Sequence, residues 1–335
     1  MRALTLSVFT LWFSLYYVIG QAQPRENPWK INLNIVDESG SPVVAAKVWL
    51  EYGTSRNGAS SDLSQATGWA ITGLTDKYGA FSGGHTDSSH GLRIRIEDDG
   101  YYSSALDYPL YLPSQFDGQQ VFANRNPNLT LVIKKIGHPI AMYARHAKTE
   151  IPEINVKIGY DLIQADWVAP YGKGKSSDMV FEAQKRWISR KDFDSSVEIS
   201  FPNKGDGIIS VHVPLQQASQ MRMGATAPAE GYLQQVKKNL SHTPANGWKD
   251  DEREGNKDQN YYLRIRTKLD ENGNVKSALY GKMHGDFALD PINSKTVKIF
   301  FDYYINPTAN SRNVEFDPKQ NLFKRLTADE NIDRP

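Results

Sequence analysis

The chain of 335 residues contains no cysteine. This absence excludes disulfide bonds, thiolate metal sites, cysteine nucleophiles and a lipid-bearing cysteine. After residue 22 the sequence also lacks any run that is long and apolar enough to span a bilayer. We therefore expect a protein that is stabilised by its hydrophobic core, with no membrane span after the first residues are removed.

An excess of either charge is missing as well. The 39 Lys and Arg residues nearly balance the 38 Asp and Glu residues, so the composition predicts no nucleic-acid partner. There is no Gly-x-Ser-x-Gly nucleophile elbow. The segment that starts at Asp270 lacks the glycine and glutamate positions of a calcium-binding loop. These absences favour a protein with no cofactor and no catalytic activity.

The first 22 residues have the three parts of a cleavable secretory signal. Arg2 supplies the positive charge, residues 3–19 the apolar stretch, and Gly20 and Ala22 the small exit pair. The alternative is an uncleaved anchor, for which residues 3–19 are at the short limit. Because exported proteins without disulfides are commonest in Gram-negative bacteria, we expect a periplasmic or extracellular location.

Apolar and polar residues alternate with a period of two over much of the chain, which is typical of strands. Short segments of this kind, separated by turn residues, predict a mainly β protein with at most one or two short helices. One helix is expected at residues 229–240, where Tyr232, Val236 and Leu240 recur every four residues. The predicted organisation is a β-sandwich at 27–136, a second antiparallel β domain at 137–323 and a flexible tail at 324–335.

Three segments of the first domain carry a family resemblance. They are the turn Gly40-Ser41-Pro42 within residues 35–48, the run Thr75-Asp76-x-x-Gly79-x-Phe81, and Asp99-Gly100-Tyr101-Tyr102. In these segments residues 30–135 resemble carboxypeptidase regulatory-like domains, which are transthyretin-like β-sandwiches. The resemblance implies a spacer, docking surface or adhesin part without catalysis. In the second domain, residues 166–174, 201–207 and 305–318 are similar to segments of uncharacterised exported bacterial proteins, which implies no activity.

A loop of the second domain is the first candidate binding site. Its aromatic residues suit stacking on a sugar ring or a peptide, and its charged residues suit contacts with polar groups of the same ligand. The residues are Asp166, Trp167, Tyr171, Lys173, Lys175 and Asp178. The alternative is a turn whose aromatic side chains fold back into the core.

Gly174-Lys175-Ser176 in the same loop matches a relaxed phosphate-binding loop pattern. Such a loop needs a parallel strand before it and a helix after it, so that backbone N–H groups hold phosphate. The surroundings predict antiparallel strands instead. We therefore interpret the match as an exposed lysine-bearing loop.

The hairpin around residues 270–274 provides the second candidate surface. If Leu269 lies opposite Val275, one face of the hairpin is apolar and the other is basic with interleaved tyrosines. The candidate residues on the basic face are Arg264, Arg266, Tyr280 and Lys282. This face suits an acidic polysaccharide or a nucleic acid; the alternative is a solvated face on which Arg264 lies over Tyr280.

His284 and Asp286 are two residues apart, which places both side chains on one face of a strand. The two side chains suit a metal site or an acid–base pair, but a metal site would also need a third ligand. The sequence thus favours an exported, non-enzymatic binding, adhesion or envelope-structural protein with a glycan or protein partner. The alternatives are a carbohydrate-binding or carbohydrate-active protein with its site in the second domain, and a metal-dependent hydrolase.

Overall fold

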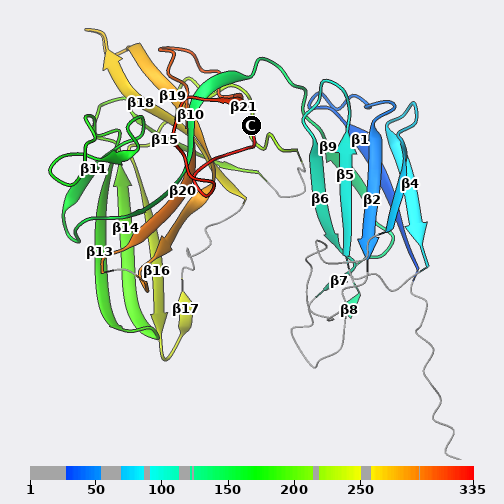
Figure 1. The fold of residues 1–335 in the computed structure, drawn as a ribbon, viewed down its shortest axis with the longest axis horizontal. Helices are drawn as coiled ribbons and strands as arrows, with labels where there is room; N and C mark the ends of the chain where they lie inside the picture. The colour runs from blue at the N-terminus through cyan, green and yellow to red at the C-terminus, as the bar shows by residue number, and fades with distance from the viewer. Residues whose placement is uncertain are drawn as a thin grey trace, which may run out of the picture.

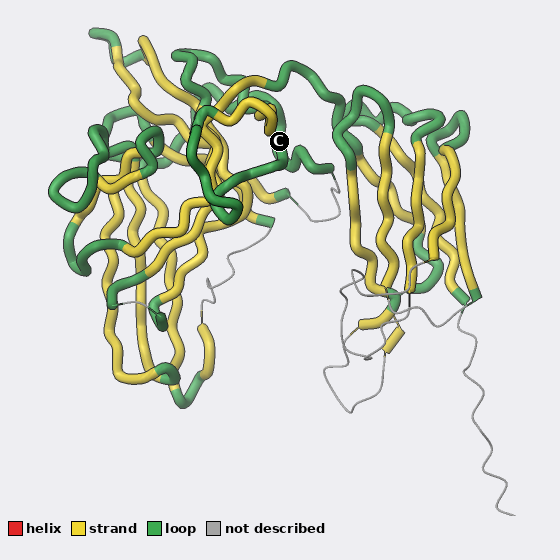
Figure 2. Tube along the Cα trace, viewed as in Figure 1, coloured by secondary structure: helices red, strands yellow, loops and turns green. Residues whose placement is uncertain are grey.

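The computed structural model describes residues 28–53, 69–86, 91–112, 121–122, 124–213, 219–249, 258–293 and 295–335. These residues form strands joined by turns and loops, without a helix (Figure 2). This confirms the predicted mainly β fold class. Within the described parts of the chain, no helix is long and apolar enough to cross a membrane. The predicted signal at 1–22 lies outside the described residues.

Two sheets pack face to face in the first part of the chain, which we call the N-terminal sandwich (Figure 1). One sheet has the order β4-β1-β9 and the other β3-β2-β5-β6, and a short β7-β8 pair lies beside them. The strands are β1 (Trp29–Val36), β2 (Lys47–Gly53), β3 (Trp69–Leu74), β4 (Ala80–His85), β5 (Gly91–Glu97), β6 (Ser104–Pro109), β7 (Tyr111–Leu112), β8 (Val121–Phe122) and β9 (Asn128–Val132).

Alternation along the strands builds the core of this sandwich. Ile31, Leu33 and Ile35 of β1 are buried and face Leu50 and Ile94 of the other sheet, whereas the residues between them are more exposed. The predicted turn at Gly79 needs glycine for two reasons. Its φ is +73°, and a Cβ there would lie 2.4 Å from the backbone oxygen of Ile35.

The second part of the chain forms two six-stranded sheets, which we call the C-terminal sandwich (Figure 1). The inner sheet has the order β15-β18-β19-β20-β10-β21, and the outer sheet has the order β12-β11-β13-β14-β16-β17. The strands are β10 (Ile140–Glu150), β11 (Lys157–Asp161), β12 (Asp166–Trp167), β13 (Met179–Ser189), β14 (Asp192–Ser200), β15 (Gly207–His212), β16 (Gln235–Thr243), β17 (Gly247–Lys249), β18 (Gln259–Leu269), β19 (Val275–Asp290), β20 (Lys298–Ile305) and β21 (Phe316–Asn321).

The inner sheet is covered on both faces. One face meets the outer sheet across a core that contains Phe181, Phe287 and Phe301. The other face lies under loops and the C-terminal segment, in a second core that contains Tyr262, Tyr304 and Val314 among others. The polar side chains that are buried on the inner sheet therefore have to find their partners inside the protein.

The expected helix at 229–240 is wrong. Residues Gln235–Thr243 are strand β16, and Leu233 exchanges two backbone hydrogen bonds with Ile208 just before it. The i, i+4 spacing of Val236 and Leu240 also places both residues on one face of a strand, because the strand period is two. The pattern alone could not separate the two structures.

The expected flexible tail at 324–335 is also wrong. Ile332 is buried in the second core of the inner sheet. Glu330 forms an ion pair with Arg145, and Arg334 forms one with Asp302 at 2.7 Å. An apolar side chain and complementary charges hold the chain end on the inner sheet.

Glu315 joins the two sandwiches and is almost fully buried. Its carboxylate accepts hydrogen bonds from the Tyr102 hydroxyl at 2.7 Å, from the N–H of Gly137 at 2.7 Å and from the N–H of His138 at 2.6 Å. Nearby, Lys134 donates to the backbone oxygens of Arg222 and Met223 at 3.0 Å each. Hydrogen bonds of the Glu315 carboxylate and the Lys134 ammonium thus hold the two sandwiches together at their connection.

We predict that Glu315→Ala lowers the free energy of unfolding by ~3 kcal/mol, because the buried Tyr102 hydroxyl and two backbone N–H groups lose a charged acceptor. Tyr102→Phe removes one of these hydrogen bonds and should cost ~1 kcal/mol. Urea unfolding followed by tryptophan fluorescence measures both values. Equal effects of the two substitutions would contradict the central role of Glu315.

Candidate functional site

The loop that carries the first candidate site is organised by two buried carboxylates and one arginine. Arg266 donates from Nε to Asp178 Oδ1 at 2.8 Å and from Nη2 to Asp178 Oδ2 at 2.9 Å. The same Nη2 donates to Asp161 Oδ1 at 2.9 Å. Asp178 is fully buried and Asp161 nearly so. This bidentate geometry ties the loop to strand β18.

Both oxygens of Asp161 are in use. Oδ1 accepts the N–H groups of Ile163 and Gln164, and Oδ2 accepts those of Lys175 and Ser176 at 2.9 and 3.0 Å. Burial of Asp161 disfavours its charge, but the N–H donors and the charge of Arg266 outweigh burial and lower its pKa below the ordinary value.

This arrangement explains the phosphate-loop pattern at Gly174-Lys175-Ser176. The N–H groups that would hold a phosphate are bonded to the carboxylate of Asp161 instead. A bound phosphate would have to replace a buried carboxylate that also bonds Arg266. The structure therefore agrees with an ordinary loop at this position.

The predicted stacking role of Trp167 is wrong. Its ring lies in the core against Tyr160 and Phe181, at 5.0 and 5.5 Å between ring centroids, and its Nε1 donates to Thr149 Oγ1 at 3.0 Å. Packing inside a ring of aromatic neighbours leaves no free face for a ligand.

The other residues of the predicted site do not converge. The Tyr171 hydroxyl donates to Glu153 at 2.7 Å, although the ring is 38% exposed. Asp166 accepts the N–H groups of Trp167 and Lys173 and thereby closes a turn. Lys173 and Lys175 are exposed. Ligand binding by these exposed residues stays a prediction.

The predicted solvated basic face of the hairpin is wrong, although its register is confirmed, since Leu269 pairs with Val275. Arg264, Tyr280 and Lys282 are buried beneath the second core. Arg264 donates to the backbone oxygens of Gly205 and Ala229 and lies over the ring of Tyr232, not of Tyr280. Segments far away in the sequence cover this face.

Arg266 leaves the basic face altogether. The pairing of β18 with β19 shifts between Ile265 and Lys268, and Arg266 has a φ of +54° at this bulge. The bulge turns the guanidinium of Arg266 towards Asp161 and Asp178 on the side of the outer sheet.

A bulge also separates the predicted pair His284 and Asp286. Gly285 between them has a φ of +76°, and the pairing of β19 with β20 shifts after His284. His284 Nδ1 lies 3.1 Å from the Tyr304 hydroxyl in the second core, whereas Asp286 bonds Lys238 and Tyr261 in the core between the sheets. In the described residues, no group of three His, Asp or Glu side chains is arranged to hold a metal ion.

Two buried basic groups on β19 have atoms without a hydrogen-bond partner in the described residues: Lys282 Nζ and His284 Nε2. Burial, together with the nearby charge of Lys134, lowers the pKa of Lys282 to about 7. Burial and the charge of Lys282 hold the pKa of His284 well below its ordinary value. His284 is therefore held in its neutral form at physiological pH, whereas Lys282 changes its charge close to that pH.

The structure also reveals a surface that the sequence did not predict, at the far end of the outer sheet. Trp187, Phe193, His242 and Trp248 come from β13, β14, β16 and β17 and lie directly opposite one another in register. Adjacent rings are 5.5, 6.4 and 4.8 Å apart between centroids. Four neighbouring strands thus contribute one ring each to a continuous row.

Part of this row is open to solvent. Trp187 is 40% exposed, Trp248 is 37% exposed, and the neighbouring Ile188 is 66% exposed. The exposed cations Arg190 and Lys191 follow in the β13–β14 turn, and neither forms an ion pair with a described residue. We call this surface, made of Trp187, Ile188, Trp248, Arg190 and Lys191, the aromatic tip.

One feature of the sequence does indicate the aromatic tip, although hydrophobic alternation does not reveal it. Trp187-Ile188 lies at the end of a strand whose buried alternation has already stopped, since every residue from Arg186 to Ser189 is exposed. A large apolar pair directly before polar turn residues is unusual on a solvated hairpin. Its partners in the row, however, are fixed by strand pairing across some 60 residues of chain.

A shallow hollow of about 360 Å³ lies over the same three strands β13, β14 and β16. Its lining is polar and includes Gln184, Arg186, Asp194, Ser196, Lys237 and Asn239. Arg186 is already paired with Asp192 at 3.0 Å.

Comparisons with known proteins assign no family. No family model and no curated protein matches the chain. Solved structures that align include 3-chlorocatechol 1,2-dioxygenase from Rhodococcus opacus 1CP (11% identity, 32% of this chain, 60% of that chain, TM-score 0.23). Another is the shaft pilin SpaA from Lactobacillus rhamnosus GG (9% identity, 86% of this chain, 94% of that chain, TM-score 0.23). A third is a streptococcal ancillary pilin (10% identity, 89% of this chain, 63% of that chain, TM-score 0.20). Likenesses at these TM-scores carry no functional assignment.

We predict that Arg266→Met lowers the free energy of unfolding by about 3–5 kcal/mol at pH 7, because it leaves two buried carboxylates without their cation. The deficit should be smaller at pH 4, because loss of the cation raises the pKa of both buried carboxylates, which then take up protons at a higher pH than in the wild type. Urea unfolding at both pH values measures this.

The exposed pair Arg186–Asp192 offers a matched control. Arg186→Met should cost less than about 1 kcal/mol. If Arg266→Met cost no more than this control, the loop would not depend on the arginine.

We predict that Lys282→Met stabilises the protein at pH 7 and below, because a buried ammonium that lacks a hydrogen-bond acceptor in the described residues is replaced by an apolar chain of similar length. The folded-state pKa of Lys282, about 7, lies below that of the unfolded chain, about 10.4. Between these values the unfolded chain binds more protons, so wild-type stability should rise with pH. The variant should lack this rise.

Thermal unfolding from pH 6 to pH 10 tests the prediction. Lys268→Met, on an exposed residue of the same hairpin, should leave the pH dependence unchanged. A Lys282→Met protein that is less stable than the wild type at pH 7 would show that the ammonium has a partner.

Proposed function

We propose that this chain is an exported, non-enzymatic protein that acts outside the cytoplasm by contact through its surfaces. One observation carries the proposal: the aromatic tip leaves two tryptophans and an isoleucine exposed together at one end of the C-terminal sandwich. Large exposed apolar groups beside cations mark interaction sites, because they cost solubility unless a partner covers them.

The sequence supports export and a binding role. Residues 1–22 have the parts of a secretory signal. Residues 30–135 resemble carboxypeptidase regulatory-like domains, and we propose that they form such a module, which holds the C-terminal sandwich at a distance or docks it. In this proposal Glu315 and Lys134 keep the two sandwiches in one orientation, so that the aromatic tip faces away from the N-terminal sandwich.

A second candidate function is carbohydrate binding at the aromatic tip. Sugar rings present flat C–H faces that stack on indole rings, and the row of rings extends across four strands. This candidate moves the predicted carbohydrate site from the loop at 166–178 to the end of the outer sheet. It requires no catalytic residue.

The proposal predicts that the mature chain, residues 23–335, binds through Trp187 and Trp248. The immobilised protein is exposed by biolayer interferometry to soluble neutral polysaccharides, to acidic polysaccharides and to the mature chain itself. We expect a response to at least one of these probes and a loss of about tenfold or more in the Trp187→Ala/Trp248→Ala variant.

Leu233→Ala is the matched control, because Leu233 is an exposed apolar residue of the same sandwich that belongs to neither candidate site. Circular dichroism checks that each variant folds. No response to any probe, or an equal loss in the Leu233→Ala variant, would overturn the contact role of the aromatic tip.

A further inference from the structure

A second surface with exposed apolar groups lies on the N-terminal sandwich. A hollow of about 490 Å³ there is lined by Leu74, Glu97, Asp98 and Asp99 among others. Leu74 is 60% exposed, and Val44 in the neighbouring turn is 53% exposed. We call this surface, made of Val44, Leu74, Asp98 and Asp99, the acidic end.

The acidic end carries unbalanced negative charge. Its hollow has three acids in its lining and one base, Lys47. Glu97 is partly neutralised by Arg95 at 3.4 Å, but neither Asp98 nor Asp99 forms an ion pair with a described residue. A partner that suits this surface combines positive charge with exposed apolar groups.

The aromatic tip of the same chain has this combination. Arg190 and Lys191 lie beside Trp187 and Ile188 in the β13–β14 turn. Each surface thus offers what the other one needs: apolar side chains to cover and charges of the opposite sign to pair. Complementary charges at a rim steer association and fix its register.

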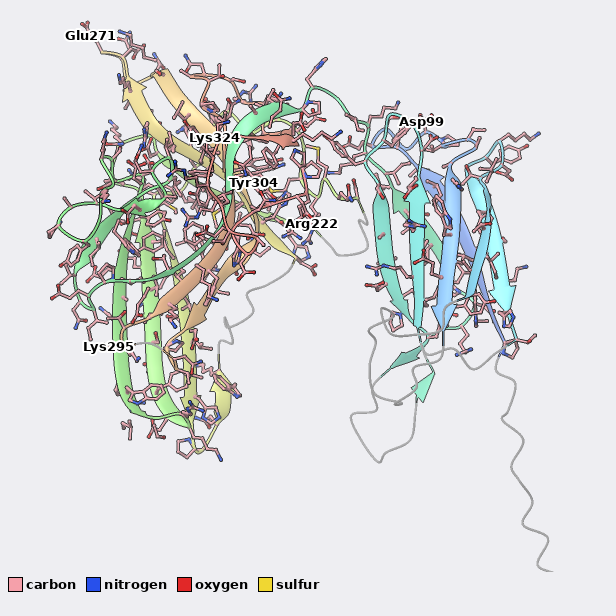
Figure 3. All side chains as sticks on the ribbon, viewed as in Figure 1. Asp99, Arg222, Glu271, Lys295, Tyr304 and Lys324 are labelled. Carbon is pink, nitrogen blue, oxygen red and sulfur yellow. The ribbon has the colours of Figure 1, made fainter. Side chains whose placement is uncertain are left out.

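The two surfaces lie on different sandwiches and at opposite ends of the molecule. Asp99 is at the upper end of the N-terminal sandwich in Figure 3, whereas β16 and β17 meet at the lower end of the C-terminal sandwich in Figure 1. They therefore cannot meet within one molecule. Between two molecules they can meet without any change in the fold, and the pair would still offer one free aromatic tip and one free acidic end.

We propose that the partner of the aromatic tip is the acidic end of a second copy of this chain. The inference rests on the proposed function and names the partner for that same surface. Because the two surfaces differ, the contact is heterologous, and repetition of it adds copies head to tail. The chain is then a self-associating structural element, in which the apolar groups of one copy cover those of the next.

The contact is small, so the affinity of a single contact should be weak, with a Kd of order 10–100 µM. Exposed charge pairs contribute to it and are screened by salt. Association should therefore increase with protein concentration and decrease as the salt concentration is raised. Sedimentation velocity of the mature chain over a concentration series measures both trends.

Charge reversal provides the decisive experiment. Arg190→Glu/Lys191→Glu makes the aromatic tip acidic, and Asp98→Lys/Asp99→Lys makes the acidic end basic. Each variant alone should sediment as a monomer, because its two surfaces then carry like charges. An equal mixture of the two should associate at least as strongly as the wild type, because every tip then meets an end of opposite charge.

These substitutions avoid Lys249, because the acid-rich run that follows it lies outside the described residues. Lys324→Glu/Arg325→Glu, which reverses two exposed cations elsewhere on the C-terminal sandwich, is the control and should leave association unchanged.

Three results would overturn the inference. They are a wild type that stays monomeric at its highest soluble concentration, a mixture that fails to associate, and self-association that survives in each single variant. Polysaccharide binding that depends on Trp187 and Trp248, without self-association, would keep the proposed contact role and remove only the second copy as partner.

Discussion

The inner sheet of the C-terminal sandwich is buried on both faces, and most features of that sandwich follow from this constraint. A buried antiparallel sheet cannot leave its polar side chains to water, so each needs an internal partner. Arg264 bonds two backbone oxygens, and Asp286 bonds Lys238 and Tyr261. Lys282 lacks a hydrogen-bond acceptor in the described residues, and burial lowers its pKa to about 7.

Two bulges change which face of the inner sheet the side chains of β18 and β19 point to. The positive φ angles at Arg266 and Gly285 each interrupt the alternation of side chains once. Without the first bulge, the guanidinium of Arg266 would point into the second core, and Asp161 and Asp178 would lack a cation. A local change in backbone conformation thus decides which charges meet across the sandwich.

The features predictable from the sequence were those that nearby residues determine. Alternation predicted the strands, and the turn at 270–274 predicted the pairing of Leu269 with Val275. The cover over Arg264, Tyr280 and Lys282 was not predictable, because it comes from residues tens of positions away, such as Ala229 and Val314. For the same reason the basic face looked solvated and Trp167 looked available, although both are buried.

The aromatic tip follows from unequal strand lengths in the two sheets. Lys185 of β13, two residues before Trp187, donates a hydrogen bond to the backbone oxygen of Thr296 in the facing hairpin. Beyond this point β14 and β16 continue past Lys295 (Figure 3). The rings of Trp187, Phe193, His242 and Trp248 pack against one another there, and the outer two remain partly exposed. A sheet that extends beyond its partner leaves an apolar edge, which a contact with another molecule would bury.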